Sequence, residues 1–170
     1  MKQFLLAIFV ILLAPLLVFS QSNKQWLVEK FKNADTILLV SHKVNAGITV
    51  TDEKTYKEIP LPALMVNGRP NKEIILEEQV IKDQDIDALL QILTQAGIAT
   101  SKGTCFIPRQ SIFLFKNGQI SFIDISFSCH AYNTSTDLKD IGALGESEWK
   151  ELEDYFIKHG LTYNLGEPLN

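Results

Sequence analysis

The sequence predicts an α+β domain in which about three helices pack on a mostly antiparallel sheet of about five strands, including two hairpins. Three observations support this fold class. Asn-Gly pairs at residues 67–68 and 117–118 each separate two β-rich runs, as in hairpin turns. Apolar residues recur at helical spacing in three other segments. The regular alternation of strands and helices that is typical of a doubly wound parallel sheet is absent.

The three helical segments cover residues 23–34, 86–96 and 147–160. Asn23 is placed to cap the first helix, and Gly97 follows the second, where a glycine often ends a helix. The residues expected on the buried faces of these helices are Leu27, Phe31, Ile86, Leu89, Leu90, Leu93, Ala96, Trp149, Leu152, Tyr155, Phe156 and His159.

Other segments have the composition of strands. The continuous apolar run at residues 36–41 is typical of a strand that is covered on both faces. A short strand is expected at residues 48–51. Residues 61–66 and 72–78 flank the turn sequence at residues 67–70, so we expect these two segments to pair as a hairpin.

The strongest local pattern is a longer hairpin. Its strands are expected at residues 111–115 and 119–127, and residues 116–118 join them. If all three joining residues form the loop, with the glycine in the left-handed region, Phe115 pairs with Gln119. A two-residue turn would shift this register by one position.

The two cysteines, Cys105 and Cys129, lie on either side of this hairpin. The three-residue loop makes them face each other, whereas a two-residue turn misses that match by one position. We expect a structural disulfide, whose closed loop would stabilise the fold by about 3.5 kcal/mol in the chain-entropy model. One alternative is a pair of buried free thiols. The other is a metal or redox site at Cys129 and His130, which the opposite directions of neighbouring strand side chains disfavour.

Residues 1–20 have the features of a signal peptide. A positive start precedes an apolar run at residues 4–19, and the small residue Ser20 precedes a cleavage site before Gln21. A retained membrane anchor is the alternative, but this run is shorter than the ~20 residues that span a bilayer. We therefore expect residues 21–170 to form a single exported domain, periplasmic or extracellular after cleavage.

Composition excludes several classes of protein. Hydrophobic residues make up 46% of the chain, and about 41% once residues 1–20 are removed, which is typical of a soluble domain and too high for a disordered one. The 20 acidic and 16 basic residues give a net charge of −4. Since no basic cluster is present, we expect no nucleic-acid partner. Membrane contact is expected only through an uncleaved signal segment.

The catalytic signals are weak. His42, His130 and His159 show no His-Glu-x-x-His spacing, and the chain has neither a Gly-x-Ser-x-Gly elbow nor a phosphate-binding glycine loop. We therefore expect no metal and no cofactor. His42, at the end of an expected strand, is the best candidate for a catalytic base, but the neighbouring Ser41 cannot be its nucleophile because adjacent strand side chains diverge.

Arg109 is one of only two arginines, and it follows Pro108 inside an apolar hairpin. A guanidinium in such surroundings needs a partner, and Asp124 on the opposing strand is the obvious one. We expect a structural ion pair between Arg109 and Asp124. The alternative is an anion-binding site for a ligand, so Arg109 and His42 are the candidate ligand-binding residues.

The longer hairpin carries the motif Cys105-Phe-Ile-Pro108-Arg109, and its second strand ends in Phe127-Ser-Cys129. With these motifs, residues 61–130 resemble a group of short exported bacterial proteins of unknown role, which share a Cys-x-x-Pro-Arg hairpin closed by a Phe-x-Cys segment. That group commonly has a further cysteine where Ser126 stands and a histidine where Gln110 stands. A metal or redox role implied by that richer pattern therefore has less support here, and the resemblance implies no activity.

The sequence thus predicts a non-enzymatic extracytoplasmic module that binds a protein or small-molecule partner through its sheet or hairpin region. Export, a packed α+β core and the lack of a catalytic constellation motivate this hypothesis. The alternative is a small exported hydrolase or thiol-redox enzyme that uses His42, Arg109 or the cysteines.

Overall fold

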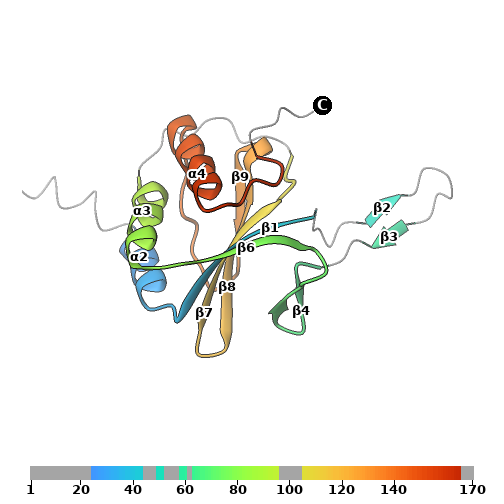
Figure 1. The fold of residues 1–170 in the computed structure, drawn as a ribbon, viewed down its shortest axis with the longest axis horizontal. Helices are drawn as coiled ribbons and strands as arrows, with labels where there is room; N and C mark the ends of the chain where they lie inside the picture. Colours follow the sequence, from blue (N-terminus) through green and yellow to red (C-terminus); the bar gives the residue numbers. More distant parts are fainter. Residues whose placement is uncertain (1–23, 44–48, 52–57, 61–62, 96–104, 166–170) are drawn as a thin grey trace, which may run out of the picture.

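The computed structural model of the chain describes residues 24–43, 49–51, 58–60, 63–95 and 105–165 (Figure 1). The expected signal segment, the cap at Asn23 and the helix end at Gly97 lie outside these residues. Among the described residues, no helix has both the length and the apolar character needed to cross a membrane. The described part is an α+β fold, as the sequence predicts.

The main sheet is fully antiparallel and has the strand order β6-β1-β7-β8-β9. Its strands are β1 (Thr36–His42), β6 (Ile75–Ile81), β7 (Gln110–Lys116), β8 (Gln119–Ser126) and β9 (Ala131–Thr134). Two small ladders accompany it, formed by β2 (Thr49–Thr51) with β3 (Glu58–Pro60) and by β4 (Met65–Val66) with β5 (Arg69–Pro70). The sheet therefore places strands that are distant in sequence side by side.

In the described part of the chain, three α-helices pack on the sheet: α2 (Gln25–Lys32), α3 (Asp83–Thr94) and α4 (Glu146–Lys158). The helix α3 begins three residues before the expected start at Ile86. Its first turn contains Asp83 and Asp85, and acidic side chains near a helix N-terminus interact favourably with the helix dipole. The hydrophobic periodicity identified this helix but not its polar first turn.

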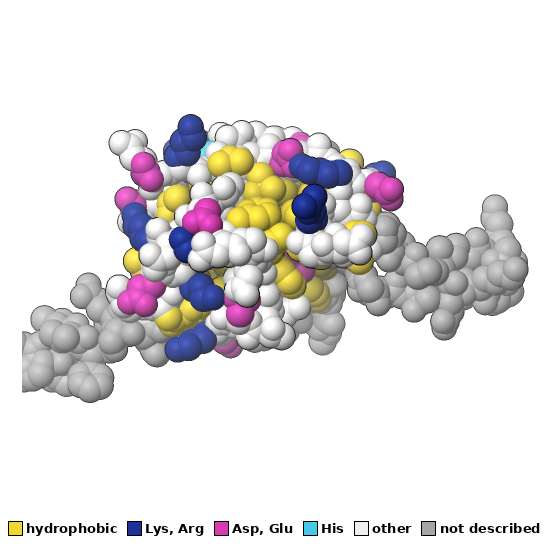
Figure 2. Space-filling model, turned by 90° about the horizontal axis from the view of Figure 1, so that it is seen from below, with side chains coloured by type: hydrophobic (Ala, Val, Ile, Leu, Met, Phe, Trp, Pro, Cys, Tyr) yellow, Lys and Arg dark blue, Asp and Glu magenta, His cyan; other side chains and the backbone are white. Residues whose placement is uncertain are grey.

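The sheet has two different faces. We call one the helix face, because its side chains share the large core with α2, α3 and α4; examples are Leu39, Ile112 and Ile123. The other, the open face, has a smaller cluster around Val40 and Phe113, which the β4–β5 hairpin covers in part. Figure 2, a view from below, shows hydrophobic side chains in the middle of the surface with charged side chains around them.

The prediction that residues 61–66 pair with residues 72–78 in a hairpin is wrong. The structure contains a much shorter hairpin, in which Met65 pairs with Pro70, and β6 pairs with β1 in the main sheet instead. Pro70 has no N–H to continue a ladder, so the chain turns away after it and is free to join a distant strand.

The register expected for the longer hairpin is also wrong by one position. Lys116 pairs with Gln119 across a two-residue turn, in which Asn117 and Gly118 have φ values of 48° and 77°. Positive φ at both positions is the type I′ geometry, whose twist matches that of the flanking strands. A consequence is that Ser111 lies directly opposite Asp124.

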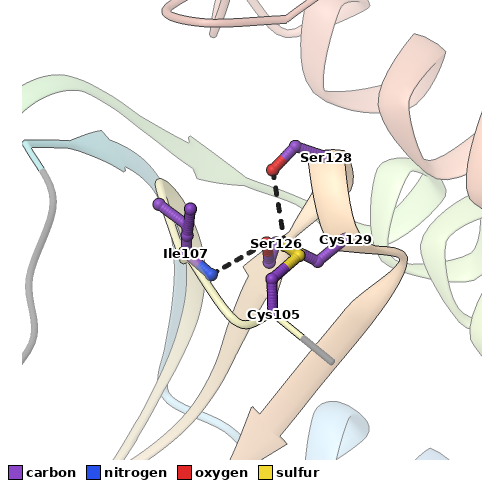
Figure 3. The surroundings of a disulfide bond; sticks show 5 residues. All are labelled: Cys105, Ile107, Ser126, Ser128 and Cys129. Atoms are coloured by element: carbon purple, nitrogen blue, oxygen red, sulfur yellow. Dashed lines mark hydrogen bonds between the residues drawn. A yellow bond between two sulfur atoms is a disulfide. The ribbon is translucent and has the colours of Figure 1, made fainter. Parts of the chain in front are cut away.

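The disulfide between Cys105 and Cys129 is confirmed, although the register argument for it fails (Figure 3). Both cysteines lie outside the β7–β8 ladder: Cys105 precedes β7, and Cys129 ends a short 3₁₀ turn after β8. The backbone N–H of Ile107 donates to Ser126 Oγ at 3.1 Å, which helps to hold the segment before β7 against β8. The Cα–Cα separation is 5.7 Å, an ordinary value for a disulfide.

Candidate functional site

A pocket of about 350 Å³ lies on the helix face, beside α2 and the turn-proximal ends of β7 and β8. We call it the α2 pocket. From α2 and the C-cap residue that follows it, the pocket receives Trp26, Lys30 and Asn33, which are spaced by three or four positions. This spacing places side chains on one side of a helix, so the sequence of α2 directs an indole, an amine and an amide toward the same hollow.

The sheet and the segment after β9 complete the pocket. Leu114 on β7 lies opposite Ser121 on β8, so both side chains face the hollow. Asp137 and Lys139 enter from the segment that follows β9. The site is therefore assembled from three regions of the chain that are distant in sequence.

Asp137 is the most strongly bound charged group of the pocket. Its carboxylate accepts hydrogen bonds from Lys30 Nζ at 2.9 Å, Ser121 Oγ at 2.5 Å and Ser135 Oγ at 2.7 Å. Partial burial would raise the pKa of Asp137, but these three donors outweigh it and lower the pKa to about 2. Asp137 is consequently ionised at neutral pH and holds Lys30 in place.

The other charged groups at the pocket differ in how they are paired. Lys116 forms an ion pair with Asp35 at 2.8 Å. Lys139 and Glu29 form no ion pair with any other described residue, and both side chains are exposed. Beside the half-buried Trp26, the pocket thus presents one cation and one anion that are available to a ligand.

His42, the candidate base, lies on the open face and is fully buried. Its Nε2 atom is 2.9 Å from Ser111 Oγ, which in turn lies 2.7 Å from Asp124 Oδ1. Its Nδ1 atom lies 2.8 Å from the carbonyl oxygen of Lys43. We call His42, Ser111 and Asp124 the buried polar chain.

The order of residues in the buried polar chain differs from that of a hydrolytic triad. In a triad the histidine lies between the serine and the acid, so that it can take the serine proton. Here the serine lies between the other two, and Ser111, like His42, has no exposed surface. A substrate carbonyl has no path to the Ser111 hydroxyl in this arrangement, so the geometry favours a structural or proton-holding role.

Arg109, the second candidate ligand-binding residue, contacts the C-terminal part of the chain. Its Nη1 atom lies 3.3 Å from Tyr163 Oη, and the guanidinium carbon is 5.8 Å from the centre of that ring. The ion pair expected with Asp124 is not present among the contacts of the described residues. Asp124 faces Ser111 on the ladder, whereas Arg109 precedes β7 and extends toward Tyr163.

Two neighbouring side chains hold the same C-terminal segment. Gln110 Nε2 donates to the carbonyl oxygen of Tyr163 at 2.7 Å. The carboxylate of Glu77, on β6, accepts hydrogen bonds from the backbone N–H groups of Thr162 and Tyr163. Arg109 thus belongs to a clamp that fastens the segment after α4 to the sheet.

Sequence reasoning singled out His42, Arg109 and the cysteines but missed the α2 pocket. The one local signal for the pocket was Trp26, which lies beside the buried stripe of its helix and not within it. Among the described residues, no group of three histidine, cysteine or acidic side chains is placed to hold a metal ion. Comparison of the chain with models of protein families, with curated proteins and with solved structures finds no match.

Proposed function

We propose that the protein is an exported, non-enzymatic binding protein that holds a small polar ligand in the α2 pocket. The observation that carries this proposal is the pocket itself. Its volume of about 350 Å³ lies within the range of small-molecule sites, roughly 300–1,000 Å³. It combines an aromatic ring with two charged groups, Lys139 and Glu29, that form no ion pair with another described residue.

The lining favours a ligand with one apolar face and at least one charged group. The Trp26 ring and the Leu114 side chain offer apolar contact, and an indole face also stacks on flat or ring-shaped groups. The ammonium of Lys139 can pair with a carboxylate of the ligand, and Glu29 with an amine. Carboxylic acids and amino acids of modest size are therefore the first compounds to test.

The alternative functions, a small exported hydrolase or a thiol-redox enzyme, have less support from the geometry. A hydrolase would need an accessible nucleophile, and Ser111, the hydroxyl nearest to His42, is fully buried. The two cysteines are joined in a disulfide in the structure. Binding is favoured because it needs only the pocket.

Binding is tested by screening compounds against the exported protein purified from expressing cells. A ligand present at 100 times its Kd stabilises the fold by about 2.7 kcal/mol, which for a domain of this size raises Tm by roughly 5–10 °C. Compounds that raise Tm are then titrated by calorimetry against Trp26→Leu and Lys139→Gln. Ile157→Ala, at an exposed apolar position on α4, serves as the matched control.

The proposal expects both pocket variants to lose at least tenfold in affinity, about 1.4 kcal/mol, while the control binds as the unaltered protein does. If no carboxylic acid or amino acid raises Tm, or if both pocket variants bind as the unaltered protein does, the pocket does not hold such a ligand.

Export is tested separately by determining the amino terminus of the protein in the periplasmic or extracellular fraction. A chain that begins at Gln21 supports cleavage after Ser20. A chain that retains residues 1–20 and sediments with membranes would instead support the anchored alternative.

A further inference from the structure

The neighbours of each polar atom limit where the hydrogens of the buried polar chain (His42, Ser111 and Asp124) can lie. A carbonyl oxygen only accepts hydrogen bonds, so the contact with Lys43 O requires a proton on Nδ1 of His42. The hydroxyl of Ser111 carries one hydrogen and has two neighbours, His42 Nε2 and Asp124 Oδ1. It can donate to only one of them.

Both contacts of Ser111 are therefore hydrogen bonds only if a second hydrogen is present. If that hydrogen is on Nε2, the imidazole is charged and Asp124 is ionised. If it is on Asp124, both side chains are neutral, Asp124 donates to Ser111, and Ser111 donates to His42. The two arrangements have the same total charge and differ only in where one proton lies.

We propose that the buried polar chain is a proton-binding site, which holds one proton between His42 and Asp124 through the Ser111 hydroxyl and tightens the contact between β1, β7 and β8 when the proton is bound. This inference does not depend on the α2 pocket, which lies on the other face of the sheet. It implies that the packing of β1, β7 and β8 on the open face depends on the pH of the surroundings.

Loss of the proton leaves one contact without a hydrogen. Two acceptor atoms would then face each other less than 3 Å apart with no hydrogen between them. These atoms are either Ser111 Oγ and Asp124 Oδ1 or His42 Nε2 and Ser111 Oγ. An unsatisfied buried acceptor costs roughly 1–3 kcal/mol, so the deprotonated chain must open at one of these points. Because His42 is on β1, Ser111 on β7 and Asp124 on β8, that opening loosens contacts between neighbouring strands.

The charged groups around the chain indicate where the proton lies. Burial raises the pKa of Asp124 to about 6, and the Ser111 hydroxyl opposes this only in part. Burial lowers the pKa of His42, hydrogen bonds to the backbone of Lys43 and Gln110 oppose this only in part, and the positive charge of Arg109 adds to the lowering. Both effects favour the neutral arrangement, in which Asp124 carries the proton.

The neighbouring strand adds one more charged pair. Glu78 on β6 lies on the same face as Ser111, with Val40 between them, and it forms an ion pair with Lys72. This pair supplies opposite charges side by side and therefore leaves little net field at the chain. Among the described residues, Asp124 and His42 are thus the groups on which the proton is shared.

Nuclear magnetic resonance of the complete exported protein tests the proposal directly. The carboxyl carbon of Asp124 should titrate with a midpoint near pH 6. The ring nitrogens of His42 should show a neutral imidazole protonated on Nδ1 both above and below that midpoint. A His42 ring protonated on Nε2 alone, or an Asp124 carboxyl that titrates near its ordinary value of about 4, would overturn the proposal.

Hydrogen exchange tests the coupling to the sheet. After correction for the intrinsic pH dependence of exchange, the β1 and β7 amides near the chain should exchange roughly tenfold more slowly at pH 5 than at pH 7. Asp124→Asn should remove this difference and show slow exchange at both pH values, because an amide can donate to Ser111 at any pH. Glu151→Gln, on the exposed side of α4, is the control and should respond to pH as the unaltered protein does.

A variant at the central position separates a shared proton from two independent groups. Ser111→Ala removes the hydroxyl that links the two, so exchange of the β1 amides beside His42 should no longer change as Asp124 titrates. Ser111→Thr, which keeps a hydroxyl, should retain the behaviour of the unaltered protein and provides the test if the alanine variant does not fold. If exchange of the unaltered protein is equal at both pH values, the chain does not tighten the sheet.

Discussion

Glu77 on β6 accepts a hydrogen bond of 3.0 Å from the backbone N–H of Tyr163, although 86 positions separate the two residues. The same carboxylate accepts the backbone N–H and the hydroxyl of Thr162. Burial would raise the pKa of Glu77, but these hydrogen bonds outweigh it, so the pKa lies below its ordinary value. The segment after α4 is therefore fastened to the edge strand of the sheet by a charged acceptor.

Replacing this acceptor should release the C-terminal segment. In Glu77→Ala, the amides of Thr162 and Tyr163 should exchange with solvent faster, and the free energy of unfolding should fall by about 1 kcal/mol, since the carboxylate is partly exposed to solvent. Hydrogen exchange and urea denaturation measure the two effects. Glu73→Ala, just before β6, is the control, and equal exchange in the two variants would contradict the role of Glu77.

Acidity should also weaken this contact. The folded-state pKa of Glu77 is depressed, so the stability that it contributes is present above the unfolded-state pKa and is lost as the pH falls through the folded-state value. Asp124 has the opposite sign, because its folded-state pKa is raised. The two acids should therefore be distinguishable by the direction of their effects.

The stability that Asp124 contributes should decrease as the pH rises. Its folded-state pKa of about 6 lies above the reference value of 3.8, so its contribution is fully present below about pH 4 and is lost as the pH rises through 6. The shift corresponds to roughly 3 kcal/mol. Urea denaturation from pH 4 to pH 7 should show the unaltered protein losing about that much stability relative to Asp124→Asn. Parallel curves for the two proteins would contradict this assignment.

The Cys105–Cys129 disulfide should make a large contribution to stability. Replacing both cysteines by serine should lower the free energy of unfolding by roughly 3.5 kcal/mol, because the closed loop no longer restricts the unfolded chain. Urea denaturation of the double variant measures this loss. The unaltered protein in the presence of a reductant should behave like the double variant, and a double variant as stable as the oxidised protein would show that the loop is already restricted in the unfolded state.

Local patterns were sufficient for the fold class and for the longer hairpin, but not for its register. Asn117 and Gly118 both adopt positive φ, and the same two residues suit a two-residue or a three-residue loop. The disulfide was predicted correctly from a register that is wrong. Its cysteines lie outside the ladder, where the backbone can adjust by one position.

Non-local features were harder to predict. The partner of β6 is β1, a strand some 40 positions away, and nothing in the local sequence of residues 72–78 distinguishes that pairing from a hairpin with the preceding segment. The α2 pocket is equally hard to predict, because Trp26 and Asp137 come to line the same pocket only when the chain has folded. His42 and Arg109 could be identified as candidates from their residue types alone, whereas the pocket is defined by which side chains the fold brings together.

The turn between β7 and β8 provides a final test of how the hairpin register is set. Gly118 has φ of 77°, and a Cβ at this position would meet no atom within 4 Å, so the cost of a side chain there is confined to the backbone conformation. Gly118→Ala should therefore lower the free energy of unfolding by roughly 1–2 kcal/mol. Gly118→Asn should recover most of that loss, because asparagine tolerates the left-handed region. Urea denaturation compares the two variants. Equal losses would mean that the side chain is excluded by something other than backbone strain, and no loss in either would mean that the hairpin can adopt the three-residue loop instead.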